Sequence, residues 1–402
     1  MTDVVGDPYG KASYIPKLKE SGIMVLTDLD GTFTTGDKIP SSNELNDRAA
    51  VRQLLLDRGL VAGAVTARTP ALTMSSSVYQ ASKKLGFLEP EPKWGVEQVT
   101  GRRVPVPLEG VSFFDHSLDW DVSAGFGSGI CLRNGHGYMV DHNYFDLLKH
   151  DAAKKGASKP EPWRLSMLAF LADTFPEAGE YMSPLENRSN YEQDLTDVAP
   201  LEYRFQLDFK GSSGLAQMNA LVSAIERKKS EGHSVALRIA LVDESRPDRN
   251  NPENSKYTLY LIPWGARKEK MINRLFSESA KAAGRPTKDL RLFYAGDTLT
   301  DLRAGLWGGG DAQTTFLLAT GSRVAPYIQN REPSFGSESL DFLWSSLKRP
   351  EDRLQRTDEE GVYTFNLQSS YYKKPNRIVI GDERYSGMTP PGSVHAFLKE
   401  FL

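Results

Sequence analysis

Three short apolar runs, each followed at once by polar side chains, constrain the fold of this chain more than any other feature. Continuous apolar runs of this kind are typical of strands that are buried on both faces of a parallel sheet. The polar residues that follow would then lie at the carboxyl edge of that sheet. The runs span 23–26, 61–65 and 290–295, and they lead to Asp28, Thr66 and Asp297.

Helical patterns lie between these runs. Residues 45–58 carry apolar side chains along one side and end at Gly59, and residues 268–283 form a second such segment. A helix start is also indicated at 69–70, where Thr-Pro precedes apolar residues spaced four, three and four apart. Strands that alternate with helices predict an α/β fold with a Rossmann-like parallel sheet core.

The middle of the chain has a different pattern. It predicts a strand at 203–209, a helix at 215–229 and strands at 235–242 and 257–262, which together indicate an inserted α+β unit with an antiparallel sheet. The parallel pattern then resumes, and residues 331–375 have no clear pattern. We therefore expect a first core part at 1–141, an insert at 142–262, and a second core part with an extended C-terminal region at 263–402.

The carboxyl edge of the expected sheet gathers groups suited to catalysis. Ligands of open parallel sheets bind beyond the carboxyl ends of the strands. Four carboxylates crowded at this edge would repel one another, and a bound divalent cation would relieve that repulsion. Oxygen-only ligands favour Mg²⁺. The residues expected at this edge are Asp28, Asp30, Thr66, Lys268, Asp297 and Asp301.

Four segments of the chain resemble, in order, the four sequence motifs of the haloacid dehalogenase superfamily. Each lies at the end of its expected element where the family has it. The fourth departs from the commonest form because Thr300 stands where asparagine is usual, although its hydroxyl keeps a hydrogen-bonding group. The segments are 27–32 (TDLDGT), 64–68 (AVTAR), 263–268 (PWGARK) and 296–301 (GDTLTD).

This resemblance implies a phosphatase that works through an aspartyl-phosphate. Asp28 would attack phosphorus, and Asp30 would protonate the leaving group and then deprotonate the hydrolytic water. Thr66 and Lys268 would bind the phosphoryl oxygens. Lys270 fits the family's spacing less well than Lys268. The implied metal set is Asp28, Asp30 through its backbone carbonyl, Asp297 and Asp301, the last of which would orient either Lys268 or a metal-bound water.

The position of the insert, between the second and third motifs, resembles a C2-type cap of the C2B-like kind. Such caps occur in sucrose-phosphate and trehalose-phosphate phosphatases and in phosphomannomutases, where they choose the leaving group. We expect Arg68, Arg204 and Lys210 to contact the substrate, beside Thr66 and Lys268. Two of these residues also have a plainer interpretation. Arg204 could be a solvated charge on the surface of the cap, and Lys210 could be part of an ordinary turn.

The leading functional hypothesis is a Mg²⁺-dependent phosphomonoester hydrolase that acts on a sugar phosphate or a phosphorylated glycoside. One alternative is a phosphomutase of the phosphomannomutase kind, which would return the phosphoryl group to a sugar. The other is a binding module that keeps the core without catalysis. Product analysis separates the two enzymes, since only the hydrolase releases inorganic phosphate without a bisphosphate activator.

Composition and charge limit the partners and the cellular compartment that can be expected for this chain. The 49 basic and 52 acidic residues nearly balance, and no basic stripe supports a nucleic-acid partner. No apolar stretch reaches the length of a membrane span. A single cysteine suits a reducing compartment, so we expect a cytoplasmic protein. Its partner would be a small phosphorylated substrate, and the chain would be a monomer or a small homo-oligomer.

Overall fold

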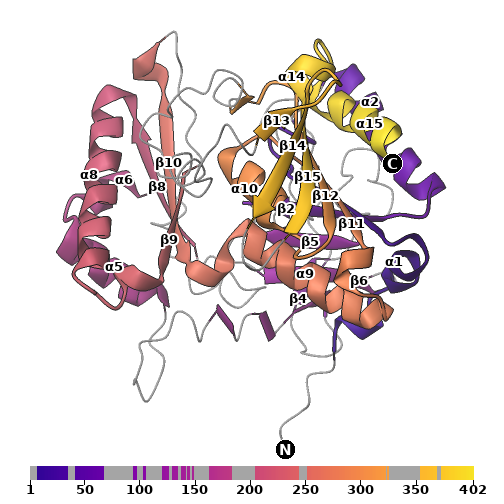
Figure 1. The fold of residues 1–402 in the computed structure, drawn as a ribbon. Helices are drawn as coiled ribbons and strands as arrows, with labels where there is room; N and C mark the ends of the chain where they lie inside the picture. The colour runs from indigo at the N-terminus through magenta and orange to yellow at the C-terminus, as the bar shows by residue number, and fades with distance from the viewer. Residues whose placement is uncertain are drawn as a thin grey trace, which may run out of the picture.

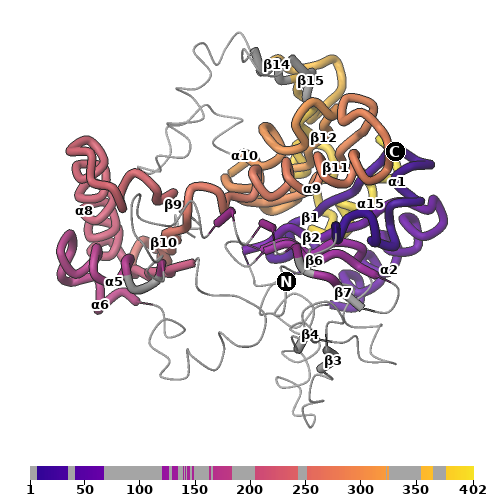
Figure 2. The backbone as a smooth tube through the Cα atoms, turned by 90° about the horizontal axis from the view of Figure 1, so that it is seen from below, coloured from indigo at the N-terminus to yellow at the C-terminus, as the bar shows by residue number. Residues whose placement is uncertain are grey.

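Most strands of the described residues belong to two separate β-sheets, as the computed structural model shows (Figure 1). The larger sheet carries the polar edge expected from the sequence, and the smaller one lies to its side with its own helices. The same separation is visible from below (Figure 2). The structure describes residues 7–34, 41–67, 94–96, 103–105, 120–125, 129–134, 137–141, 143–144, 147–148, 163–182, 204–243, 251–322, 324–325, 354–368 and 373–402.

The larger sheet has a parallel centre. Its six central strands run in the order β15-β12-β11-β1-β2-β5, and each neighbouring pair is parallel. The predicted α/β class with a Rossmann-like parallel core is therefore confirmed. The bounds are β1 (Ile23–Thr27), β2 (Val61–Thr66), β5 (Val122–Gly125), β11 (Arg291–Gly296), β12 (Gln313–Leu318) and β15 (Lys373–Ile380).

Antiparallel strands extend this sheet at both edges. On one side β5 pairs with β6 (Gly129–Asn134), and β6 pairs with β7 (Gly137–Val140). On the other side, β15 is followed by β14 (Val362–Gln368) and β13 (Leu354–Arg356). These two strands lie largely in the region whose sequence gave no clear pattern. A separate short pair is formed by β3 (Trp94–Val96) and β4 (Arg103–Pro105).

Helices cover both faces of the larger sheet. Successive side chains of a strand point to opposite faces, so the apolar residues of its central strands need a packing partner on each side. In β1, Met24 and Leu26 pack into the core shared with α1, α9 and α10, whereas Val25 packs into the core shared with α2 and α15. Both cores are apolar. The bounds are α1 (Ile15–Ser21), α2 (Ser42–Asp57), α9 (Lys268–Ala283), α10 (Leu299–Trp307) and α15 (Pro390–Phe401).

The smaller sheet is antiparallel, with the order β8-β10-β9. Alternate residues of β8, namely Phe205, Leu207 and Phe209, are buried, as expected for a strand whose one face packs on helices. The expected α+β unit is thus present, and in the sequence it lies between the two segments that form the parallel sheet. Its elements are α5 (Trp163–Thr174), α6 (Ala178–Tyr181), β8 (Phe205–Lys210), α8 (Gly211–Ser230), β9 (Ile239–Asp243) and β10 (Lys256–Pro263).

Two sequence predictions differ from the structure. The strand expected at 235–242 begins only at Ile239, because a 3₁₀ turn at Ala236–Arg238 precedes it and Arg238 Nε donates to the carbonyl oxygen of Ser234 at 2.9 Å. In addition, β5 was not predicted, because its small residues do not form an apolar run although all four are buried. The helix expected after 69–70 lies outside the described residues.

Among the described residues, none of the helices combines the length and hydrophobicity that crossing a bilayer requires.

Candidate active site

The candidate site lies where the direction of strand order reverses. From β1 the chain proceeds outward through β2 and β5, whereas the later strands β11, β12 and β15 proceed in the opposite direction. Such switch points form crevices at the carboxyl edge of open α/β sheets. Asp28 directly follows β1 and Asp297 directly follows β11, and the backbone N–H of Asp28 donates to the carbonyl oxygen of Ala295 at 2.8 Å. Both carboxylates therefore lie at the switch point.

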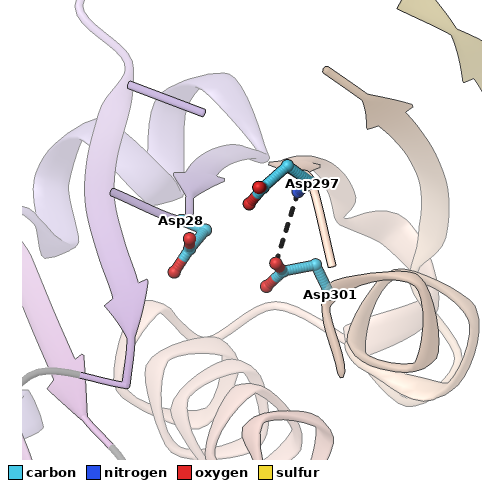
Figure 3. A group of neighbouring side chains, drawn as sticks. All are labelled: Asp28, Asp297 and Asp301. Atoms are coloured by element: carbon cyan, nitrogen blue, oxygen red, sulfur yellow. Dashed lines mark hydrogen bonds between the residues drawn. The ribbon is translucent and has the colours of Figure 1, made fainter. Parts of the chain in front are cut away.

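Three carboxylates meet there. One oxygen each from Asp28, Asp297 and Asp301 lies within 4.8 Å of the others (Figure 3). Asp28 is 4% exposed and Asp301 is fully buried, while Asp297 is partly exposed. Within the described residues this is the group of acidic side chains best placed to hold a metal ion.

Two glycines allow this close approach. Gly31 has a φ of +88°, and a Cβ atom there would lie 2.2 Å from Oδ2 of Asp297. At Gly296 a Cβ atom would lie 2.1 Å from the Cβ atom of Asp301. A side chain at either position would displace one of the three carboxylates. The glycines of the first and fourth motifs therefore have a steric reason that does not depend on any family resemblance.

Lys268 joins two of the carboxylates. Its Nζ atom donates to Oδ1 of Asp28 at 2.9 Å and to Oδ1 of Asp301 at 2.6 Å. The side chain is only 2% exposed, at the first position of α9. Lys270, two residues further along α9, is exposed, so the buried position belongs to Lys268.

Asp301 is surrounded by protein donors on both oxygens. Its Oδ1 accepts from Lys268 and from the hydroxyl of Tyr294, the latter at 2.5 Å. Its Oδ2 accepts from Thr298 Oγ1 at 2.7 Å and from the backbone N–H groups of Thr298 and Asp297 at 3.2 and 3.3 Å. Thr298 and Asp301 form the capping box that begins α10. Tyr294 was not predicted as a site residue, because in the sequence it is simply part of the apolar strand at 290–295.

Electrostatics at Asp28 fit a bound cation. Burial raises the pKa of the Asp28 carboxyl well above its ordinary value, and the neighbouring Asp301, Asp297 and Asp30 raise it further, against the opposing effect of Lys268. One ammonium group does not balance three carboxylates. A divalent cation held by oxygen atoms alone would do so, and this donor set is the kind that Mg²⁺ prefers.

Asp30 and Thr66 lie beside this cluster. Asp30 is partly exposed, its Oδ1 accepts from Thr34 Oγ1 at 3.4 Å, and its carboxylate is not one of the three that converge. Thr66 is the last residue of β2 and is 1% exposed. The parallel pairing of Thr27 with Ala64 sets Thr66 level with the segment that follows Asp28. Arg68 lies outside the described residues.

Of the expected insert residues, the structure brings Arg204, but not Lys210, to the sheet edge that carries the candidate site. Arg204 is 4% exposed, lies over the ring of Tyr260, and donates through Nη1 to the carbonyl oxygen of Ala67, directly after Thr66. Lys210 is exposed at the other end of β8. Six residues of extended strand separate it from Arg204, a distance of about 20 Å.

The loop before α8 offers no vacant anion site. Gly211 already belongs to α8, and the N–H of Ser212 donates to Oε1 of Glu253 at 3.4 Å. A carboxylate of the chain itself thus occupies this helix start, which favours the plainer interpretation of the loop as a turn.

Comparisons with known proteins give distant likenesses. The haloacid dehalogenase-like hydrolase yhjK of Bacillus subtilis aligns at 14% identity over 81% of this chain and 92% of its own, with a TM-score of 0.38. The trehalose-6-phosphate phosphatase of Aspergillus fumigatus aligns at 13% identity over 79% and 91%, with a TM-score of 0.35. No protein-family model and no curated protein matches the chain. Similarities this distant establish neither a family nor an activity for it.

Proposed function

We propose that the chain is a Mg²⁺-dependent phosphomonoester hydrolase with Asp28 as its nucleophile. The observation that carries this proposal is the junction of Asp28, Asp297 and Lys268 at the carboxyl edge of the parallel sheet. Burying two carboxylates and an ammonium group together costs folding free energy. Such clusters are typical of functional sites, where the shifted pKa values serve the reaction. Phosphoryl transfer uses all three, since the reaction consists mainly of positioning and charge stabilisation.

Asp28 supplies the attacking oxygen in this scheme. Its Oδ1 already accepts from Lys268, so its other oxygen is the one that would form the bond to phosphorus. The alkoxide leaves as that bond forms, and Asp30 donates the proton that it takes up. Water then attacks the aspartyl-phosphate, Asp30 removes its proton, and inorganic phosphate is released while Asp28 is regenerated.

Lys268 and Thr66 stabilise the phosphoryl group. The ammonium group of Lys268 is held within hydrogen-bonding distance of Asp28, so it lies where negative charge develops on the non-bridging oxygens. The Thr66 hydroxyl lies at the end of the neighbouring strand and would donate to another of these oxygens. Asp301 accepts a second hydrogen bond from the same ammonium group and so helps to hold it in place.

Asp28, Asp297 and the backbone carbonyl of Asp30 would hold Mg²⁺. When bound, this ion supplies the positive charge that allows a carboxylate to approach an anionic phosphate. Asp301 belongs to the predicted metal set as well. Because both of its oxygens already accept from protein donors, we assign it the orienting role instead.

The smaller sheet would act as the cap of this site, within the insert at 142–262. Its face opposite the buried phenylalanines carries polar side chains that are bonded to one another. Gln206 donates to Asp208 at 3.1 Å, Thr258 donates to Asp208 at 2.9 Å, and Arg204 donates to Gln206 at 2.9 Å. Amide, carboxylate and hydroxyl groups in a row suit the hydroxyls of a sugar, which supports a sugar phosphate or phosphorylated glycoside as the substrate.

A phosphate-release screen tests the proposal. Sugar phosphates, glycoside phosphates and nucleotides are incubated with the protein and Mg²⁺, and inorganic phosphate is measured without any bisphosphate activator. Asp28→Asn should lower turnover by at least about a thousandfold. The matched control is Asp121→Asn, because Asp121 is also a buried carboxylate beside a lysine, Lys17 at 3.3 Å, but precedes β5 at the opposite end of the sheet. Equal activity of the two variants would exclude Asp28 as nucleophile.

A further inference from the structure

We propose that Tyr294 is a positioning residue that fixes the Asp301 carboxylate for Lys268. This inference deepens the proposed function and rests on it for its kinetic consequences. It stands on three linked contacts: Tyr294 to Asp301 at 2.5 Å, Asp301 to Lys268 at 2.6 Å, and Lys268 to Asp28 at 2.9 Å. The tyrosine hydroxyl is thus two hydrogen bonds from the ammonium group and three from the proposed nucleophile.

Asp301 is held on both sides. Thr298 fixes Oδ2 through its hydroxyl and its backbone N–H, while Tyr294 and Lys268 share Oδ1. Without the tyrosine hydroxyl, Oδ1 keeps Lys268 as its only hydrogen-bonded side-chain partner among these contacts. The carboxylate could then turn about its Thr298 anchor, and Lys268 would follow either Asp301 or Asp28.

Tyr294 itself has little freedom to move. It is fully buried in β11, a central strand, where its backbone pairs with Leu26 on one side and Phe316 on the other. Its ring also packs against the ring of Phe316, with centroids 5.6 Å apart. The hydroxyl is therefore presented to Asp301 by a rigid part of the sheet, which is the support that a precise site requires.

The chain contains a second group of the same chemistry that serves as an internal comparison. Tyr9 donates to Oδ2 of Asp141 at 2.8 Å, and Arg274 donates to both oxygens of the same carboxylate at 2.6 and 3.1 Å. Tyr9 is 2% exposed and Asp141 is fully buried. Arg274 lies six residues after Lys268 on α9, about 9 Å along the helix axis. Tyr9→Phe thus removes an equivalent hydrogen bond without touching the candidate site.

The kinetic test compares Tyr294→Phe with Tyr9→Phe, using a substrate found in the phosphate-release screen. A misplaced Lys268 weakens binding of the charge that develops in the transition state more than binding of the substrate. Tyr294→Phe should therefore lower kcat about tenfold and change KM less than about threefold. Tyr9→Phe should leave both near the wild-type values. Equal kinetics for the two variants, with both folded, would overturn the inference.

A second measurement does not depend on activity. Tyr294→Phe, Lys268→Met and the double variant are compared by urea unfolding, because residues in one hydrogen-bond network give non-additive effects. We expect a departure from additivity of at least about threefold in the unfolding equilibrium constant. The pair of Tyr9→Phe with Lys268→Met should be additive. Additive behaviour of Tyr294 with Lys268 would overturn the inference even if no substrate had been found, whereas absent phosphatase activity with intact coupling would count against the proposed function alone.

Discussion

Arg204, directly before β8 of the smaller sheet, donates through Nη1 to the backbone carbonyl oxygen of Ala67, directly after β2 of the larger sheet. Ala67 directly follows Thr66, so this contact joins the smaller sheet to the edge that carries the candidate site. The ring of Tyr260 lies under the guanidinium group, whose centre is 4.8 Å from the ring centroid. Arg204 is thereby fixed at the boundary between the two sheets.

This geometry predicts how Arg204→Lys will behave. A lysine keeps the charge but cannot bond Ala67 and Gln206 at once in the planar arrangement of a guanidinium group. We expect KM for a sugar phosphate to rise about tenfold, with a much smaller change for a small generic phosphomonoester that does not reach the smaller sheet. Initial rates with both substrates provide the measurement.

The control for this variant is Arg238→Lys. Arg238 also donates to a backbone carbonyl oxygen, that of Ser234. Both residues lie just before β9, so this hydrogen bond does not reach the larger sheet. Its substitution should leave KM for both substrates unchanged. If Arg204→Lys weakened both substrates equally, Arg204 would support the fold of the edge and not the choice of leaving group.

Because the pKa of Asp28 is raised, we expect Asp28→Asn to increase the free energy of unfolding while it removes the proposed nucleophile. A carboxyl group whose folded-state pKa lies above its unfolded value contributes its full stability below about pH 3.8 and loses it as the pH rises through the folded-state pKa. Asn resembles the protonated form and undergoes no such loss. In EDTA, Asp28→Asn should therefore be more stable than the wild type at pH 8, by on the order of 1 kcal/mol, and the difference should vanish near pH 4.

Mg²⁺ separates this effect from ordinary burial. Burial also raises the pKa of Asp121, so Asp121→Asn is expected to show the same sign in EDTA. Only the advantage of Asp28→Asn should disappear on addition of Mg²⁺, since the ion would stabilise the ionised Asp28 of the wild type. Urea unfolding at several pH values, with and without Mg²⁺, tests both statements. An Asp28→Asn variant less stable than the wild type at pH 8 in EDTA would contradict them.

The parallel core was predicted well from the sequence because its central strands are continuous apolar runs. Examples are β1 (Ile23–Thr27) and β2 (Val61–Thr66). Strand β5 was not predicted, because Ser123, Ala124 and Gly125 are small, and only the neighbouring strands show that this segment is buried. Boundaries shifted for a local reason at β9, where a 3₁₀ turn replaces the first residues of the expected strand.

Part of the candidate site could likewise be predicted from the sequence, and part of it could not. Asp28, Asp297, Asp301 and Lys268 were expected together because each lies directly after a strand or in the first turn of a helix, and the structure brings them together; their roles stay predictions. Tyr294 could not be found from the sequence, since an inward-facing tyrosine in a strand looks like any other core residue. The contact between Arg204 and Ala67 depends on how two sheets meet, 137 residues apart in the chain, which no local pattern encodes.

Asp297 and Asp301 should differ in their response to substitution by asparagine. Asp297 accepts from Thr32 Oγ1 at 3.3 Å and is partly exposed, so its oxygens remain suited to an ion. Asp297→Asn should weaken Mg²⁺ binding by at least about tenfold. Asp301→Asn should change Mg²⁺ affinity less than Asp297→Asn does and reduce turnover instead, because its carboxylate serves Lys268. Calorimetric titration with Mg²⁺ alone provides the comparison, and equal losses of affinity would place Asp301 among the ligands.

Gly31 gives a steric test of the same cluster. Gly31→Ala adds a Cβ atom 2.2 Å from Oδ2 of Asp297, in a backbone conformation with φ of +88°. We expect Asp297 to be displaced, so that Mg²⁺ affinity and phosphate release both fall by about tenfold or more. Gly59→Ala is the matched control, because Gly59 also has a positive φ, +59°, but a Cβ atom there meets nothing within 4 Å.

The control variant should lose only the roughly 1–2 kcal/mol that a left-handed conformation costs an alanine, with normal Mg²⁺ binding and turnover. The comparison therefore separates backbone strain, which both variants share, from the displacement of Asp297, which only Gly31→Ala produces. Mg²⁺ titration, phosphate release and urea unfolding of the two variants measure each part. Wild-type Mg²⁺ affinity in a folded Gly31→Ala protein would show that Asp297 does not need its present position, and the proposed metal site would then have to be abandoned.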